Sequence, residues 1–265
     1  MSRTPEYDFL FNGDLTMPTT LNGWIRANPA QADFAANGSL PDNAIDKWAF
    51  YSETQEALLT IPRSLSRESR ISRSAEISGK VVIEPGAVVL PGAFVEGPAF
   101  IGRNVIVGNS SLVRRGTILA NDSTVGNHCN CTAVLFAPGV RVTHFCGVSR
   151  SILEQDCCLS AFVITGTLRA DARPVTLNAP LGETPPEKRG CIIGQRTYVA
   201  PHVTISPGVQ IGHDCFIGSF VVVNENVPAG KRYRIHNTAE VDDNNLELAR
   251  RMIRLEIDFE ETELR

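Results

Sequence analysis

Large aliphatic residues recur at every sixth position along most of the chain. The first run consists of Ile71, Ile77, Ile83, Val89, Val95, Ile101, Val107, Val113, Leu119 and Val125. The spacing then lapses, returns at Leu153 and Leu159, and resumes as Ile193, Val199, Ile205, Ile211, Ile217 and Val223. A period of six fits neither the 3.6-residue repeat of an α-helix nor one long alternating strand. It predicts a repeated unit of short strand and turn.

A small or β-branched residue usually stands two positions before each aliphatic one, as at Ala87, Ala93 and Ala99. Pro-Gly pairs recur between units, and both residue types favour tight turns. Three units would form one triangular coil, and coils stacked about 4.8 Å apart would pair their backbones. The sequence therefore predicts an all-β parallel β-helix over residues 66–237.

The segments on both sides of the repeat have different patterns. Residues 1–65 lack the period and contain both tryptophans, Trp24 and Trp48, which predicts a small packed N-terminal cap or part of a substrate pocket. In 238–265, Asn244 and Glu247 resemble a capping box before an apolar stripe of helical spacing, which predicts a C-terminal α-helix. Both segments are suited to cover the open ends of a solenoid.

Residues 166–190 interrupt the repeat and contain four prolines. A segment of this length without regular structure is usually functional or disordered. It is interpreted as a protruding loop that can reach a neighbouring molecule. Arg169 and Arg173 within it are candidates for contact with an acceptor substrate or a phosphate, or else they are solvated.

Charge and cysteine content narrow the range of partners. The formal net charge of -4 argues against nucleic acid and against an anionic membrane surface. The absence of an apolar leader and of a run of eighteen apolar residues predicts a cytoplasmic protein. Seven cysteines, an odd number, are most simply reduced thiols.

Several segments carry a resemblance to a known family: Val113-Arg114-Arg115-Gly116-Thr117, Val125-Gly126-Asn127, Thr143-His144-Phe145 and Cys191-Ile192-Ile193-Gly194. With the repeat, they resemble the left-handed β-helix of the hexapeptide-repeat acyltransferases. Residues 99–235 are most similar to the acetyltransferase domain of the archaeal-type bifunctional glucosamine-1-phosphate acetyltransferase/N-acetylglucosamine-1-phosphate uridylyltransferase. The nucleotidylyltransferase domain of that enzyme is not expected here.

The resemblance implies a homotrimer with active sites between subunits and acetyl-CoA lying along the groove. It places the catalytic histidine at His144, a sugar-phosphate arginine at Arg114 and a cofactor-groove alanine at Ala161. Three substrate positions depart from the family pattern: Gly147 replaces a tyrosine, Thr132 a lysine and Thr167 an asparagine.

The residues themselves leave alternatives open at these positions. His144 can act as a general base because free imidazole titrates near pH ~6.5, and it can equally be a structural hydrogen-bonding group. Lys231, Arg232 and Arg234 follow the last coil and are candidates for the phosphates of CoA, or they form a solvated turn.

The coil that contains His128, Cys129, Cys131, His144 and Cys146 has the residue types of a zinc site. Coils of 17 or 18 residues would stack these positions, but buried cysteine is also a common small apolar residue. No metal is expected.

The predicted function is CoA-dependent transfer of an acyl group, with acetyl favoured. The acceptor would be an amine or hydroxyl of a sugar, sugar phosphate or nucleotide sugar, and Arg114, Arg169, Arg173 and Thr167 would bind it. One alternative is a non-catalytic binding or scaffold subunit, favoured by the three departures. Another is an enzyme of different chemistry in the same intersubunit cleft.

Overall fold

The computed structural model describes residues 9–10, 18–175 and 188–235. The chain divides into two units, 1–234 and 235–265, and the described residues belong to the first unit except for Ile235. The predicted C-terminal helix lies outside the described residues, as does the middle of the predicted loop. No helix among the described residues is both long and apolar enough to cross a bilayer.

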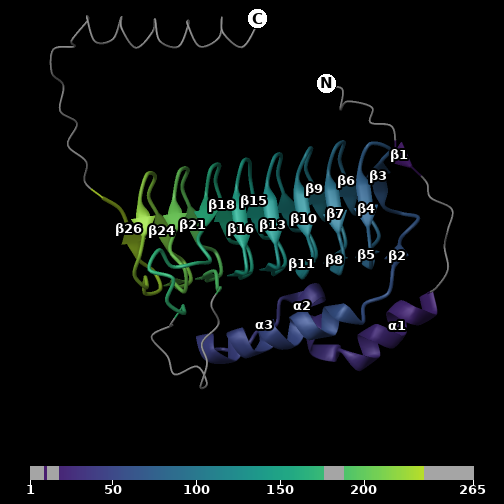
Figure 1. Cartoon of the computed structure of the whole chain (residues 1–265), viewed down its shortest axis with the longest axis horizontal. Coiled ribbons are helices and arrows are strands. Elements are labelled where there is room, and N and C mark those ends of the chain that lie inside the picture. Colours follow the sequence, from purple (N-terminus) through teal and green to yellow (C-terminus); the bar gives the residue numbers. More distant parts are fainter. Residues whose placement is uncertain (1–8, 11–17, 176–187, 236–265) are drawn as a thin grey trace, which may run out of the picture. The chain divides into compact units, whose positions relative to one another are not determined.

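The strands form three sheets that share the coils between them (Figure 1). Sheet A contains β1 (Phe9–Leu10), β3 (Arg70–Ser72), β6 (Val88–Val89), β9 (Ile106–Val107), β12 (Thr124–Val125), β15 (Arg141–Val142), β18 (Cys158–Leu159), β21 (Tyr198–Val199), β24 (Phe216–Ile217) and β26 (Arg232–Tyr233). Sheet B contains β2 (Ser64–Leu65), β5 (Val81–Ile83), β8 (Ala99–Ile101), β11 (Thr117–Leu119), β14 (Leu135–Phe136), β17 (Ile152–Leu153), β20 (Ile192–Ile193) and β23 (Gln210–Ile211). Sheet C contains β4 (Glu76–Ser78), β7 (Phe94–Glu96), β10 (Leu112–Arg114), β13 (Asn130–Thr132), β16 (Gly147–Ser149), β19 (Ile164–Thr165), β22 (Thr204–Ile205) and β25 (Val222–Val223).

The fold prediction is confirmed as a left-handed parallel β-helix, whose strands pair with the strand one coil away. Only β1 is antiparallel among the described strands, where it pairs with β3. The residues with six-residue spacing point inward: Val89, Val107 and Val125 are fully buried on sheet A. The small residues Ala87, Ala93 and Ala99 are also buried, at or beside the corners where three walls converge.

The lapse in the repeat is a shortening of the coil. Residue Val113 pairs with Cys131, 18 positions on, whereas Cys131 pairs with Val148, 17 positions on. The inward series therefore continues through Phe136 and Val142, both fully buried. The apolar interior is continuous through this region, although the count of six is not.

Three helices cover the outer face of sheet B: α1 (Pro18–Ala27), α2 (Pro29–Asn37) and α3 (Ala44–Leu59) (Figure 1). The outward positions of sheet B are apolar and buried in one cluster with Trp24, Phe34 and Trp48. These outward residues are Val82, Phe100, Ile118, Leu135, Ile152 and Ile192. The expectation that this segment covers an open end is therefore corrected: its helices lie along a side of the solenoid.

Helix α3 is fixed at its start and along the corner between sheets C and B. The Asn43 side chain accepts a hydrogen bond from the Asp46 N–H at 3.0 Å, which caps the helix. Further along, Gln55 Nε2 donates to the carbonyl of Gly116 at 2.9 Å, and Tyr51 Oη donates to the carbonyl of Ala133 at 2.8 Å, one coil on. Successive turns of α3 thus bind successive coils.

Candidate functional site

His144 lies on the corner that joins sheet A to sheet C, between β15 and β16, and its side chain is exposed. Its Nδ1 accepts a hydrogen bond from the Asn127 N–H at 3.2 Å. In the neutral ring this arrangement leaves the proton on Nε2. For the ring to accept a proton, Nδ1 must give up this hydrogen bond, which would also free the Asn127 N–H.

Ala161 occupies the equivalent position one coil later, beside His144. The coils are held together here because the Phe162 N–H donates to the His144 carbonyl at 3.0 Å. The structure therefore brings together the two residues that the resemblance assigned to catalysis and to the cofactor groove. Gly147 adds to the open space, since a Cβ built there would have only Ile164 Cδ1 nearby, at 3.0 Å.

A ladder of stacked rings runs along the same corner, next to His144 in sequence. Neighbouring ring centroids are 5.1, 5.1, 4.7 and 4.9 Å apart, with interplanar angles of 4° to 8°. The ring ladder consists of His128, Phe145, Phe162, His202 and Phe220. Each has a positive φ, which turns its side chain out of the corner. The phenyl rings are 44% to 66% exposed, so this corner is an apolar edge facing solvent.

Arg114 lies at the opposite edge of sheet C, near α3. Its Nε is 3.3 Å from Glu96, which also pairs with Arg115 at 2.6 Å. These guanidinium groups hold the pKa of Glu96 below its usual value, Arg115 through its hydrogen bond most of all. A cavity of about 500 Å³ opens here, lined by Gln55, Glu56, Leu59, Pro98, Arg114, Arg115, Gly116, Thr132, Ala133 and Arg150.

The described residues of the predicted loop 166–190, called the arm from here on, contact one another. Arg169 pairs with both carboxylate oxygens of Asp171 at 2.9 and 2.7 Å, and the Arg173 N–H donates to the same group at 3.2 Å. The Arg169 hydrogen bonds lower the pKa of Asp171 to about 2. The Thr167 carbonyl accepts from the Arg189 N–H at 3.0 Å, which closes the base of the arm. The charge of Arg169 is thus balanced locally.

Lys231, Arg232 and Arg234 are exposed on the last described coil. Arg232 extends over the Phe216 ring, with its Cζ 5.4 Å from the ring centroid. Phe216 in turn stacks on Tyr198 at 5.6 Å. These residues form a cationic and aromatic platform on the outer face of sheet A, which begins two coils from His144 at Tyr198 and ends four coils away at Arg232, or about 19 Å at the usual coil spacing.

The thiols and imidazoles of the cysteine-rich coil are on opposite sides of the solenoid wall. Cys129, Cys131 and Cys146 are buried in the core, and burial raises the pKa of Cys131 well above its usual value. His128 and His144 are exposed on the outside. Within the described part of the chain, no three or more metal-ligating side chains gather.

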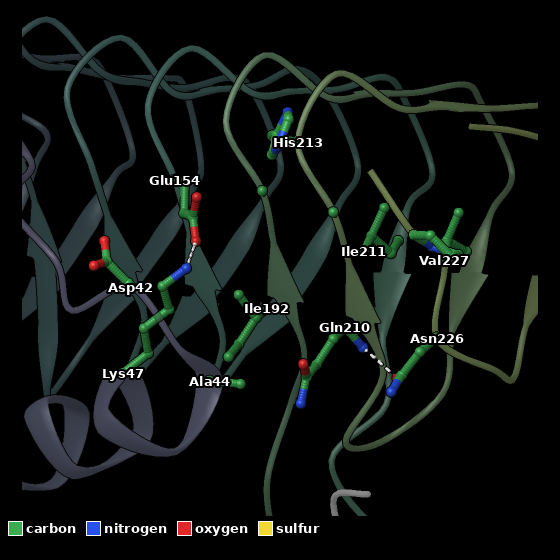
Figure 2. A pocket seen from close by; sticks show the side chains of 13 residues that line it. Asp42, Ala44, Lys47, Glu154, Ile192, Gln210, Ile211, His213, Asn226 and Val227 are labelled. Carbon is green, nitrogen blue, oxygen red and sulfur yellow. Dashed lines mark hydrogen bonds and ion pairs between the residues drawn. The ribbon is translucent and has the colours of Figure 1, made fainter. Parts of the chain in front are cut away.

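A second cavity of about 310 Å³ lies where α3 begins, at the corner between sheets B and A (Figure 2). Lys47 Nζ on α3 is 2.5 Å from Glu154 Oε1, and both side chains are largely buried. On the other side of the cavity, the Gln210 N–H donates to Asn226 Oδ1 at 2.9 Å. None of the predicted site residues lines this cavity.

Sequence reasoning missed Arg150, the α3 wall of the larger cavity and the ring ladder. The ladder has a readable signal, because its first three residues are separated by 17 positions each, the length of the shortened coil. No such signal marks Arg150 and Glu56, because they line the same cavity only as a result of how α3 packs against the solenoid.

Comparisons with known proteins give a matching family model, Bacterial transferase hexapeptide (six repeats), over residues 190–225. Bifunctional protein GlmU of Methanococcus vannielii is 30% identical over 112 residues, covering 42% of this chain and 27% of that protein. The putative uncharacterized acetyltransferase YaiX of Escherichia coli is 32% identical over 117 residues, covering 43% of this chain and 51% of that protein. The chain thus spans about half or less of the length of these relatives.

Among solved structures, AntD, an N-acyltransferase from Bacillus cereus in complex with dTDP and 3-hydroxybutyryl-CoA, is 17% identical with a TM-score of 0.26, covering 80% of this chain and 97% of that one. A mutant perosamine N-acetyltransferase from Caulobacter crescentus, in complex with CoA and GDP-perosamine, is 13% identical with a TM-score of 0.22, covering 75% and 67%. Scores this low carry no argument about function. The family match and the repeat together confirm the resemblance of this chain to the hexapeptide-repeat acyltransferases.

Proposed function

We propose that this protein transfers an acyl group, in the first instance acetyl, from CoA to an amine or hydroxyl of a sugar phosphate or nucleotide sugar. The observation that carries the proposal is the open corner at His144, on a solenoid of hexapeptide repeats and next to Ala161. The YaiX relative is described as an acetyltransferase, which agrees with this reaction class.

His144 would act as the general base. Binding of the acceptor would turn its ring away from Asn127, which frees Nδ1, the nitrogen without a proton, to take the proton of the attacking amine or hydroxyl. The Asn127 N–H then becomes a free backbone donor beside the reacting thioester and can stabilise the developing oxyanion. The proton passes to the leaving thiolate of CoA.

The remaining residues divide between the two substrates. Ala161 would let the pantetheine arm of acetyl-CoA approach the corner, while Lys231, Arg232 and Arg234 would meet its phosphates. Arg114 and Thr132, which pair across β10 and β13, would lie under the acceptor phosphate. Arg169, Arg173 and Thr167 would bind the acceptor from the arm.

We propose a homotrimer as the working form. Sheet B is closed by α1–α3, so the exposed sheets A and C and the ring ladder between them are the surfaces left for association. Closed cyclic symmetry uses one such pair of surfaces on every copy. The proposed compartment is the cytoplasm, since all seven cysteines are free thiols.

The test is a thiol-release assay with acetyl-CoA and a panel of amino sugars, sugar phosphates and nucleotide sugars. His144→Gln should lower kcat by about 10²- to 10⁴-fold, the usual contribution of a general base. His213→Gln is the matched control, because this histidine is exposed on the corner between sheets B and A. Full activity of His144→Gln would refute the assignment. Failure of calorimetry to detect CoA binding would favour the scaffold alternative, which the substitutions at Gly147, Thr132 and Thr167 support.

A further inference from the structure

The arrangement of exposed side chains on sheets A and C shows how copies of this chain would meet, given the trimer of the proposed function. A rotation about an axis parallel to the solenoid leaves every coil at its own height. Coil n of one copy therefore faces coil n of the next. Three triangular corners that meet at the axis leave a wedge-shaped cleft between each pair of copies, walled by sheet C of one copy and sheet A of the next.

The outward positions of the two walls match in polarity in five of the described coils. Within one coil, the outward residue of sheet C stands six positions after that of sheet A. Equal heights would therefore pair residues of like polarity across the cleft: Val88 with Phe94, Ile106 with Leu112, Thr124 with Asn130, Cys158 with Ile164, and Phe216 with Val222. Of these, Ile106, Leu112, Ile164, Phe216 and Val222 are 38% to 59% exposed in the single chain.

The coil of His144 departs from this pattern, as do the pairs Arg70–Glu76 and Tyr198–Thr204, but among the described coils it alone sets a long cation against a residue without a side chain. There the outward residue of sheet A is Arg141 and that of sheet C is Gly147. The Arg141 side chain is exposed and makes no hydrogen bond or ion pair with the described residues. Opposite it, Gly147 contributes no side chain, and the space above it is open except for Ile164. A long cation thus faces a gap next to the proposed base.

We propose that Arg141 of the partner subunit completes the site at His144 by binding a phosphate group of a substrate above Gly147. A guanidinium group fits this role because it donates two parallel hydrogen bonds to phosphate oxygens and remains charged at any working pH. Its position on the facing wall would supply charge that Thr132 and Gly147 do not provide. A single copy would then lack a complete site.

Complementation between two inactive variants tests this directly. Chains with Arg141→Ala and chains with His144→Ala are co-expressed under separate tags, and the mixed assembly is purified on both. Every trimer that carries both tags has one cleft of three that joins an intact His144 to an intact Arg141 of the next copy. Turnover should therefore return to about one third of the wild-type value. If Arg141 acts within its own chain, no cleft regains both residues and the mixture stays inactive, which overturns the proposal.

A cross-linking experiment tests the geometry without any activity. Arg141→Cys and Gly147→Cys are placed in separate chains, both with Cys158→Ser because Cys158 pairs with Arg141 in sheet A. A bismaleimide cross-linker long enough to span an arginine side chain and a phosphate should give a linked dimer in the mixture but not in either variant alone, whereas the gap is too wide for a direct disulfide. Thr124→Cys with Gly147→Cys, one coil out of step, is the control and should link much less. Absence of the dimer, or equal linking of the control pair, would contradict the facing of these coils.

Steady-state kinetics identifies which substrate supplies the phosphate. A rise of at least tenfold in KM for acetyl-CoA alone would assign the group to CoA, and the same rise for the acceptor alone would assign it to the acceptor. Arg141→Lys should recover part of the loss, and Arg67→Gln, an exposed arginine of the first coil, should have no effect. Unchanged kcat and both KM values in Arg141→Gln would overturn the proposal. An inactive wild type that still cross-links would refute the proposed function and leave this interface standing.

Discussion

Tyr51 couples the docking of α3 to pH in a way that can be measured. Its ring is 8% exposed, and its hydroxyl donates to the Ala133 carbonyl across the contact between helix and solenoid. Burial raises the pKa of Tyr51 to about 12, and the nearby Arg150 and Arg189 offset only part of this effect. In the unfolded chain the same hydroxyl titrates near ~10.

The sign of the resulting pH dependence follows from this difference. Below pH ~10 the phenol is neutral in both states, and the full stability of the contact is present. Between about pH 10 and about 12, only the unfolded chain loses the proton, so stability falls. Two pKa units correspond to about 3 kcal/mol, so Tyr51 alone should cost the folded state about this much by pH ~12.

The assay is urea unfolding of wild type and Tyr51→Phe at fixed protein concentration from pH 8 to pH 11.5. At pH 8 the variant should be less stable by about 1 kcal/mol, because the Ala133 carbonyl loses its donor. Above pH ~10 the gap should close and then reverse. Buried thiols such as Cys131, whose pKa is also raised, contribute equally to both proteins and cancel in the difference.

Tyr198→Phe is the matched control, since Tyr198 is 40% exposed on sheet A. It should follow the wild-type curve at alkaline pH. A constant gap between wild type and Tyr51→Phe over the whole range would mean that Tyr51 is not held in the α3 contact, and the position of the helices on sheet B would then be wrong.

Three further substitutions probe other parts of the structure. Gly126→Ala should destabilise the chain by more than about 3 kcal/mol in urea unfolding, because its Cβ would overlap the Thr143 carbonyl oxygen below His144. The control Gly23→Ala, whose Cβ would have nothing within 4 Å, should be neutral or stabilising by up to about 1 kcal/mol. Similar losses of stability in both variants would contradict the stacking of the coils at Gly126. Lys47→Met should cost about 1 to 3 kcal/mol in thermal unfolding, since it leaves Glu154 largely buried without its partner, and an unchanged Tm would show that the pair does not hold the start of α3. Phe162→Ser should weaken self-association at least tenfold in sedimentation equilibrium because it interrupts the ring ladder, and an unchanged association constant would remove this corner from the interface.

The repeat could be predicted from the sequence because each inward aliphatic residue meets the same environment in every coil. The lapse after Val125 concealed Phe136 and Val142, since losing one residue from a corner shifts the count without opening the core. The sequence also contains a signal for the face of the solenoid that the three helices cover. The outward position of sheet B is apolar in six successive coils, as at Phe100 and Ile118, whereas the outward positions of sheets A and C include polar residues such as Asn130.

The candidate site was less accessible to sequence reasoning. His144 and Ala161 could be placed together by the coil length, because neighbouring coils stack in register. The cavity beside Arg114 could not be predicted from the sequence, because its shape depends on where α3 lies against that edge of sheet C. Contacts between copies, such as that proposed for Arg141, depend on symmetry that one chain does not contain.

The most direct test of a site shared between copies is turnover measured by active-enzyme sedimentation as the protein is diluted. All acyl transfer should sediment with a species of three chains, and turnover per chain should fall as this species dissociates. A single-chain species that keeps the full turnover rate would contradict a shared site.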